Sequence, residues 1–184
     1  MTVPDSTVGR LISTQSDQVE ERSCLFSNML RPLIIALLIV GICVVIHTVC
    51  LVYLAELLVA RRLKLLALGT AGHVGVLLFV FAVVVTLHMI EAGIWAGFYR
   101  WWNLFPDLET SLYFSITSYT TIGFGDVTLP KGWRMLGGIE GFSGVLLCGI
   151  STAFILIVLN AMLANRLPDS DLAPGLGGGN EIAR

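Results

Sequence analysis

A short stretch near the middle of the chain combines residues that could bind a cation through main-chain oxygen. Gly123 and Gly125 alternate with Ile122 and Phe124 after a pair of threonines. Glycine tolerates backbone angles that other residues resist, so successive carbonyl groups can point the same way while Ile122 and Phe124 pack outward. A column of carbonyl oxygens can replace the water around a dehydrated cation, and the Thr121 hydroxyl adds one more oxygen. The chemistry expected here is cation binding without charged side chains.

The residues before this stretch indicate a short helix that leads into it. Pro106, Asp107 and Glu109 are typical of a helix start, because the free N–H groups and the positive dipole end favour carboxylates there. The predicted helix runs from Asp107 to Tyr119, which at about 1.5 Å per residue reaches only about halfway across a bilayer. The chain must therefore return. Non-helical backbone at membrane depth is tolerated only inside protein or along a water-filled cavity.

The composition places the chain in a membrane. Of its 184 residues, 55% are hydrophobic and 13% are charged, whereas an average soluble domain carries about 25% charged residues. This excludes an ordinary cytosolic enzyme, a disordered protein and a basic nucleic-acid binder. No convergent nucleophile and base suggest catalysis, and the cysteines show no metal-binding spacing.

Three apolar runs are long enough to cross a bilayer as helices. They cover residues 33–55, 75–99 and 135–163, and about 20 apolar residues suffice to span the hydrocarbon core. The polar residues 1–31 that precede them are expected to form an exposed, partly disordered arm. A surface helix over residues 16–30 is the alternative.

The glycine-containing stretch resembles the selectivity filter of potassium channels. Residues 121–126 read Thr-Ile-Gly-Phe-Gly-Asp, with Ile and Phe in place of the Val and Tyr of the TVGYG form. Both substitutions occur within that family. Residues 111–117 resemble the pore helix of the family and residues 137–158 its inner helix, so the resemblance extends from about residue 76 to 160.

The resemblance implies an all-α membrane protein with three transmembrane helices plus a re-entrant pore helix and filter loop, its pore formed by a homotetramer. K⁺ would pass down its gradient through stacked rings of carbonyl oxygens, with no cofactor besides the permeant ion. The first helix lacks a run of Arg or Lys, so a voltage sensor is not expected. The implied ion-binding residues are Thr121, Ile122, Gly123, Phe124 and Gly125, with K⁺ held at the first four, and Asp126 at the outer mouth.

The orientation follows from the same resemblance, because the filter aspartate faces outward in the family. The C-terminus is then cytoplasmic, the N-terminus lies outside, and the protein is a multi-pass protein of the plasma membrane. The expected partners are the lipid bilayer and a regulatory partner of unknown kind, with no nucleic acid. The expected organisation is an N-terminal arm (1–31), a first transmembrane helix (32–60), a basic cytoplasmic linker (61–74), a pore domain (75–166) and a flexible cytoplasmic tail (167–184).

Two carboxylates inside the spans are candidates for supporting the filter. Glu91 and Glu140 lie about 12 and 10 Å from the outer ends of their helices. Ionisable side chains at that depth in a membrane are energetically costly and are therefore candidates for a functional role. Some family members carry a pore-helix carboxylate where this chain has Thr117. We therefore hypothesise that Thr117, Glu91 and Glu140 support the filter, the carboxylates by hydrogen bonds to polar groups of the pore helix. The alternative is a carboxylate that snorkels to the interface or stays protonated.

Two glycines, a histidine and the first apolar helix each allow more than one interpretation, and so does the function. Gly144 and Gly149 in the last apolar run are candidate gating hinges or, alternatively, points of close helix packing. His47 in the first helix is expected to make an interhelical or interfacial contact. That helix is either a peripheral span or a regulatory and assembly element. The functional alternatives are a weakly selective cation channel and a non-conducting regulatory subunit of a membrane transporter.

Overall fold

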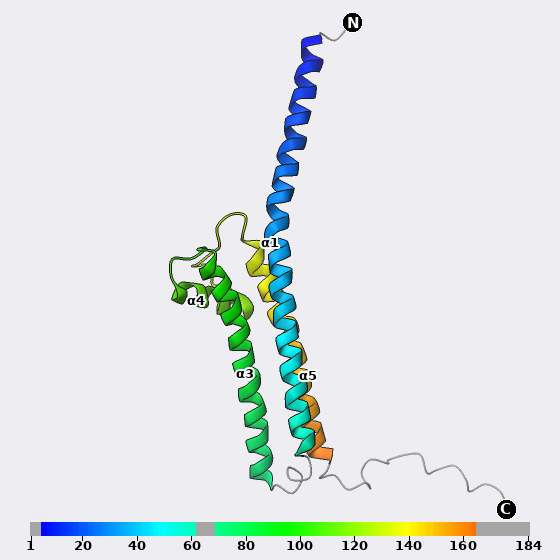
Figure 1. Ribbon diagram of the computed structural model, residues 1–184, viewed down its shortest axis with the longest axis vertical. Coiled ribbons are helices and arrows are strands. Elements are labelled where there is room, and N and C mark those ends of the chain that lie inside the picture. The colour runs from blue at the N-terminus through cyan, green and yellow to red at the C-terminus, as the bar shows by residue number, and fades with distance from the viewer. Residues whose placement is uncertain (1–4, 62–68, 165–184) are drawn as a thin grey trace, which may run out of the picture. The chain divides into compact units, whose positions relative to one another are not determined.

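The computed structural model describes residues 5–61 and 69–164, and α-helices are the only regular secondary structure in these residues. The elements are α1 (Asp5–Ala60), α3 (Thr70–Trp101), α4 (Leu108–Tyr119) and α5 (Met135–Ala164), shown in chain order in Figure 1. Three segments are long and apolar enough to cross a membrane, and they are Leu30–Ala60, Thr70–Trp101 and Met135–Leu163. The expected fold, three spanning helices with one short helix before the last of them, is confirmed.

The N-terminal arm differs from the main expectation. Helix α1 already begins at Asp5, so residues 5–31 are helical and continue into the first span without interruption. The physical reason is that extending an existing helix adds one hydrogen bond per residue fixed, whereas starting a new one is unfavourable. The only proline inside α1 is Pro32. Helix α3 begins at Thr70, five residues before the expected start. Half of the basic linker 61–74 and all of the tail 167–184 lie outside the described residues.

The described chain divides into two compact units. The first, which we call the loop unit, contains α1 up to Ile46 together with Met89–Leu146. It therefore holds α4 and the loop that follows it. Its centre is an aromatic cluster in which the ring of Phe114 on α4 lies 5.4 Å from Tyr99 and 5.0 Å from Phe105, centroid to centroid. All three side chains are buried, so this cluster fixes α4 against the end of α3.

The second unit, which we call the bridge unit, contains His47–His88 together with α5 from Leu147. Its apolar core is formed by Leu54, Val80 and Val158, one from each long helix. Phe154 packs against this core. Each of the three long helices thus contributes one buried apolar side chain to this small cluster.

A polar contact crosses the bridge unit and joins the same three helices. The Ser151 hydroxyl on α5 lies 3.0 Å from Nε2 of His47 on α1 and 3.1 Å from Nε2 of His88 on α3. We call this the His–Ser–His bridge. Because a hydroxyl carries one proton, it can donate to only one of the two imidazole nitrogens, so at least one ring donates its N–H to Ser151. The bridge makes His47 an interhelical contact, as expected from the sequence.

Candidate functional site

The start of α4 is fixed by an aspartate cap. Asp107 has an extended backbone, and its carboxylate accepts hydrogen bonds from the Thr110 N–H at 2.7 Å and the Thr110 hydroxyl at 3.0 Å. These bonds satisfy donors that have no partner inside the helix. They also lower the pKa of the Asp107 carboxyl below its ordinary value, since both favour the charged form. The helix predicted from Asp107 to Tyr119 thus begins and ends where its sequence signals placed it.

The end of α4 holds the loop of residues 120–126, which we call the glycine loop. The Thr121 N–H donates to the Ser118 carbonyl at 2.9 Å, and the Gly123 N–H donates to the Thr117 carbonyl at 3.0 Å. The last carbonyl groups of the helix therefore accept from the main chain that leaves it. The Thr117 hydroxyl donates instead to the Phe114 carbonyl at 3.0 Å. Thr117 meets the glycine loop through its main-chain oxygen, not through its side chain.

The glycine loop has an alternating backbone. Thr121, Gly123 and Gly125 have φ angles of 60°, 50° and 80°, whereas the residues between them do not have positive φ. Positive φ at every second residue can turn successive carbonyl groups toward the same side, as in a carbonyl-lined filter. For glycine this geometry is free of a Cβ penalty, but for the β-branched Thr121 it is uncommon and strained. The loop can therefore present a row of carbonyl oxygens on one side.

The side chains between these positions are uncovered within a single chain. Ile122 is 57% exposed and Phe124 is 69% exposed. The outward packing expected for them is thus incomplete in the residues that the structure describes. Large apolar side chains on a strained loop indicate a surface that is completed by something else.

The far end of the glycine loop is attached to α4 by a tyrosine that the sequence analysis did not single out. The Tyr113 hydroxyl donates to the Asp126 carboxylate at 2.8 Å. This bond raises the pKa of the Tyr113 phenol above its ordinary value, because losing the proton would place two negative charges together. Tyr113 precedes Thr117 by four residues and so lies on the same face of α4, which is the signal that could have found it.

Glu140 on α5 is buried and contacts both α3 and α4. Its carboxyl oxygens lie 2.6 Å from the Tyr99 hydroxyl and 2.5 Å from the Ser115 hydroxyl. The Ser115 hydroxyl also lies 2.7 Å from the Ala92 carbonyl oxygen. The carboxyl group is therefore the centre of a hydrogen-bond network that connects three helices, and one of its partners belongs to α4.

Glu91 on α3 contacts the end of α4. Its carboxyl group accepts a hydrogen bond from the hydroxyl of Tyr119, the last residue of that helix. Glu91 is fully buried and Tyr119 is nearly so. The two carboxyl groups proposed as filter supports thus both reach α4, Glu140 at its middle and Glu91 at its end.

Three glycines on α5 allow α4 to approach closely. A methyl group added at Gly141 would lie 2.8 Å from the Ser118 carbonyl oxygen, and one at Gly137 would lie 3.0 Å from the Phe114 ring. At Gly144 the added carbon would overlap the Tyr119 carbonyl oxygen. Gly149, by contrast, has open space where a side chain would be. Gly144 therefore packs against the helix end that leads into the glycine loop.

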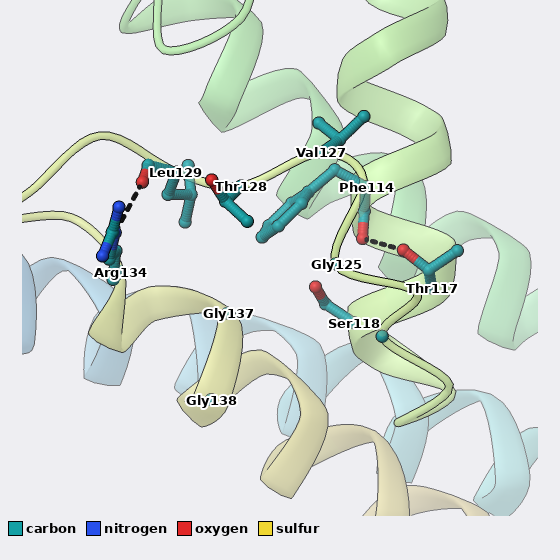
Figure 2. Close-up of a pocket in the computed structure, with 11 residues that line it drawn as sticks. Phe114, Thr117, Ser118, Gly125, Val127, Thr128, Leu129, Arg134, Gly137 and Gly138 are labelled. Atoms are coloured by element: carbon teal, nitrogen blue, oxygen red, sulfur yellow. Dashed lines mark hydrogen bonds between the residues drawn. The ribbon is translucent and has the colours of Figure 1, made fainter.

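A small cavity lies behind the glycine loop. Figure 2 shows it between α4, the loop and the first turns of α5, with a volume of about 370 Å³. Gly125 and Val127 line it from the loop and Gly137 from α5. At its edge the Arg134 Nε donates to the Leu129 carbonyl at 3.2 Å. This bond closes the turn that precedes α5.

One comparison with known proteins gives a match, and it covers this part of the chain. Residues 74–161 match a family model described as "Ion channel". The matched segment contains most of α3, all of α4 and the glycine loop, and nearly all of α5, but not α1. No curated protein and no solved structure matches the chain. The matched segment is thus similar to ion channels, and the three apolar helices indicate a multi-pass membrane protein.

Proposed function

We propose that this chain is a subunit of a potassium-selective channel in which four copies surround one pore. The glycine loop is its selectivity filter, and K⁺ passes down its gradient without a voltage sensor. In this proposal the C-terminus is cytoplasmic, the N-terminus lies outside, and the channel works in the plasma membrane. The ion is the substrate, and no cofactor takes part.

The alternating backbone of the glycine loop carries the proposal. Positive φ at Thr121, Gly123 and Gly125 is compatible with successive carbonyl groups that point to one side, as a carbonyl-lined filter requires. Four such loops around an axis would stack carbonyl oxygens in rings, with K⁺ between the rings formed by residues 121–124. Each ring would replace the water that the ion loses on entry. The C-terminal end of α4, which is the negative end of its dipole, favours a cation nearby.

The exposed residues of the loop support assembly from several copies. Ile122 and Phe124 are more than half exposed in the described part of the chain, although the loop that carries them is tied to α4 at both ends. Neighbouring copies would cover these side chains and keep the rings at a fixed diameter. Identical copies that contact one another head to tail form a closed ring when the rotation between neighbours closes.

Ion flux into liposomes that contain only the purified protein tests this proposal. We expect K⁺ flux many-fold above Na⁺ flux, and loss of that ratio in Gly123→Ala, since alanine resists the left-handed angle of Gly123. The control is Gly97→Ala, where an added methyl group meets nothing within 4 Å and φ is not left-handed. Native mass spectrometry should show four chains.

Three results would contradict the proposal in different ways. Equal flux of K⁺ and Na⁺ would identify a weakly selective cation channel. Absence of flux from folded protein would favour a non-conducting regulatory subunit. A stoichiometry other than four would remove the ring geometry.

A further inference from the structure

A second cavity lies in the loop unit, at the same end of the helices as the glycine loop. Two cationic side chains and two indole rings are among the groups that line it. It has a volume of about 390 Å³, which lies within the range of small-molecule sites. Its walls come from α1, from the residue after α3, and from the segment before α5, all within the loop unit. We call it the interfacial pocket, and the residues that line it are Arg31, Pro32, Ile35, Trp102, Lys131, Gly132 and Trp133.

Two cations meet in this pocket from distant parts of the chain. Arg31 belongs to α1 and Lys131 to the turn before α5, and both are exposed. No acidic side chain lines the pocket, and neither cation forms an ion pair with any side chain in the described part of the chain. Arg100, at the same end of the helices, differs because its guanidinium donates to the Asn103 side chain at 2.9 Å. The pocket therefore concentrates positive charge that an anion could neutralise.

Two indole rings place the pocket at the membrane boundary. Trp102 and Trp133 lie 5.9 Å apart, centroid to centroid, and Phe98 packs against both rings. Trp102 follows the last residue of α3 and Trp133 precedes the first residue of α5, so both stand where the apolar spans end. Tryptophan is enriched at that level because its ring is amphipathic. A ligand in the pocket would thus sit at headgroup depth.

An apolar stripe continues from the pocket along α1. Ile35 lines the pocket, and Leu38, Ile42 and Val45 follow at spacings of three or four residues, which places them on one face of the helix. These three side chains are 63%, 51% and 62% exposed. A ligand that fits both parts has an anionic head and apolar chains, which distinguishes a lipid from a free anion.

We propose that the interfacial pocket binds the phosphate headgroup of an anionic phospholipid, with its acyl chains along the exposed stripe of α1. The Arg31 guanidinium offers a planar fork that can donate two hydrogen bonds to one phosphate, and Lys131 adds a point charge. The inference does not depend on ion conduction. It gives α1, which lies outside the segment similar to ion channels, a lipid-binding role next to the turn that leaves the glycine loop.

Native mass spectrometry of the full-length protein, released from micelles that contain equal phosphatidylglycerol and phosphatidylcholine, tests this site. We expect phosphatidylglycerol to be retained preferentially. Arg31→Gln and Lys131→Gln should each weaken that retention about fivefold, the value of one cation near a lipid surface. Arg31→Lys should weaken the retention of phosphatidylglycerol less than Arg31→Gln does, because lysine keeps the positive charge. Arg100→Gln is the matched control, removing a cation at the same end but outside the pocket, and should retain the lipid normally.

The outcomes separate the proposal from its rivals. An equal loss in Arg100→Gln would mean that general surface charge, not the pocket, attracts the lipid, and would overturn the proposal. Unchanged retention in both pocket variants would do the same. Displacement of phosphatidylglycerol by millimolar inorganic phosphate would identify a free-anion site instead of a lipid site. Circular dichroism of each variant confirms that the helices remain, and K⁺ flux need not be measured for any of these results.

Discussion

Replacing Gly144 by alanine adds one methyl group at the closest approach of α5 to α4. The new carbon would overlap the Tyr119 carbonyl oxygen and lie 3.0 Å from its carbonyl carbon and 3.1 Å from Cδ1 of its ring. Main-chain atoms cannot swing away as a flexible side chain can. The end of α4 must therefore shift, and with it the Tyr119 hydroxyl that contacts Glu91 and the first residues of the glycine loop.

The size of the effect follows from comparison with Gly149→Ala on the same helix. Both substitutions gain the same helix propensity, about 1 kcal/mol, but only Gly144 has neighbours in the way. The difference in unfolding free energy between the two variants is therefore the cost of overpacking, which is about 1–3 kcal/mol in a packed interior. The unfolding equilibria should therefore differ by about 5- to 150-fold, with Gly144→Ala the less stable variant. Gly141→Ala, whose methyl group would meet the Ser118 oxygen at 2.8 Å, should fall between them.

Two assays check this prediction. Chemical unfolding of the purified variants in mixed micelles, followed by tryptophan fluorescence, measures stability. Ion flux in liposomes measures whether the K⁺ to Na⁺ ratio falls in Gly144→Ala, as displacement of the glycine loop requires. If Gly144→Ala were as stable as Gly149→Ala and kept the ratio, the packing argument would be refuted. A change confined to the time that channels stay open would favour the hinge interpretation of Gly144.

Four further predictions concern the hydrogen bonds. Glu140→Gln keeps an acceptor for the Tyr99 hydroxyl and should stay folded and selective, whereas Glu140→Leu should lose about 1–3 kcal/mol, because that hydroxyl loses its buried partner; unfolding in micelles compares the two. Ser151→Ala should cost roughly 1–3 kcal/mol for two interhelical bonds, each worth about 0.6–1.7, and Ser151→Thr should restore most of it in the same assay. Tyr113→Phe should reduce K⁺ selectivity in the flux assay by an amount that does not change between neutral and mildly alkaline pH, because the raised pKa of the phenol keeps it protonated; a dependence on pH in that range would contradict this. The Asp107 carboxyl, whose pKa is lowered from 3.8, should stabilise the fold above that pH and lose its contribution as the pH falls through the lower value; Asp107→Asn should flatten this part of the thermal-unfolding curve, and parallel curves would refute it.

The sequence was sufficient to predict the three helices that are long and apolar enough to cross a membrane and the short helix α4 between the last two. The length of the apolar runs identifies the spans. Asp107 marks the start of α4, because a carboxylate at that position caps the free N–H groups of a helix. The glycine loop could be recognised from its alternation of small and apolar residues. The depth of Glu91 and Glu140 also followed from counting residues along helices, and both contact α4 as the hypothesis required. Their role in ion selection stays a prediction.

What the sequence did not indicate are the partners that come from other helices. Tyr99 and Tyr119 bind the two carboxyl groups, yet spacing along a chain says nothing about which aromatic side chain faces which carboxylate across a helix interface. The left-handed angle of Thr121 was also not foreseen, because a β-branched residue disfavours it and only the bonds from the end of α4 hold it there. A helix in the arm was only the alternative, over residues 16–30, because composition alone does not show that a helix already started extends at little cost; α1 in fact begins at Asp5.

The His–Ser–His bridge has a consequence for the order in which the protein is made. Ser151 follows His47 by 104 residues, so at a synthesis rate of about 5–20 residues per second the shared hydroxyl leaves the ribosome roughly 5–20 seconds after the first imidazole. Helix α3 ends at Trp101, 50 residues before Ser151, so in the later part of that interval α1 and α3 have both been synthesised while the hydroxyl that joins them is still to come. Insertion of α5 then completes the polar contact and the apolar core of the bridge unit together. The last helix to be synthesised is therefore the one that commits the two earlier helices to their final pairing.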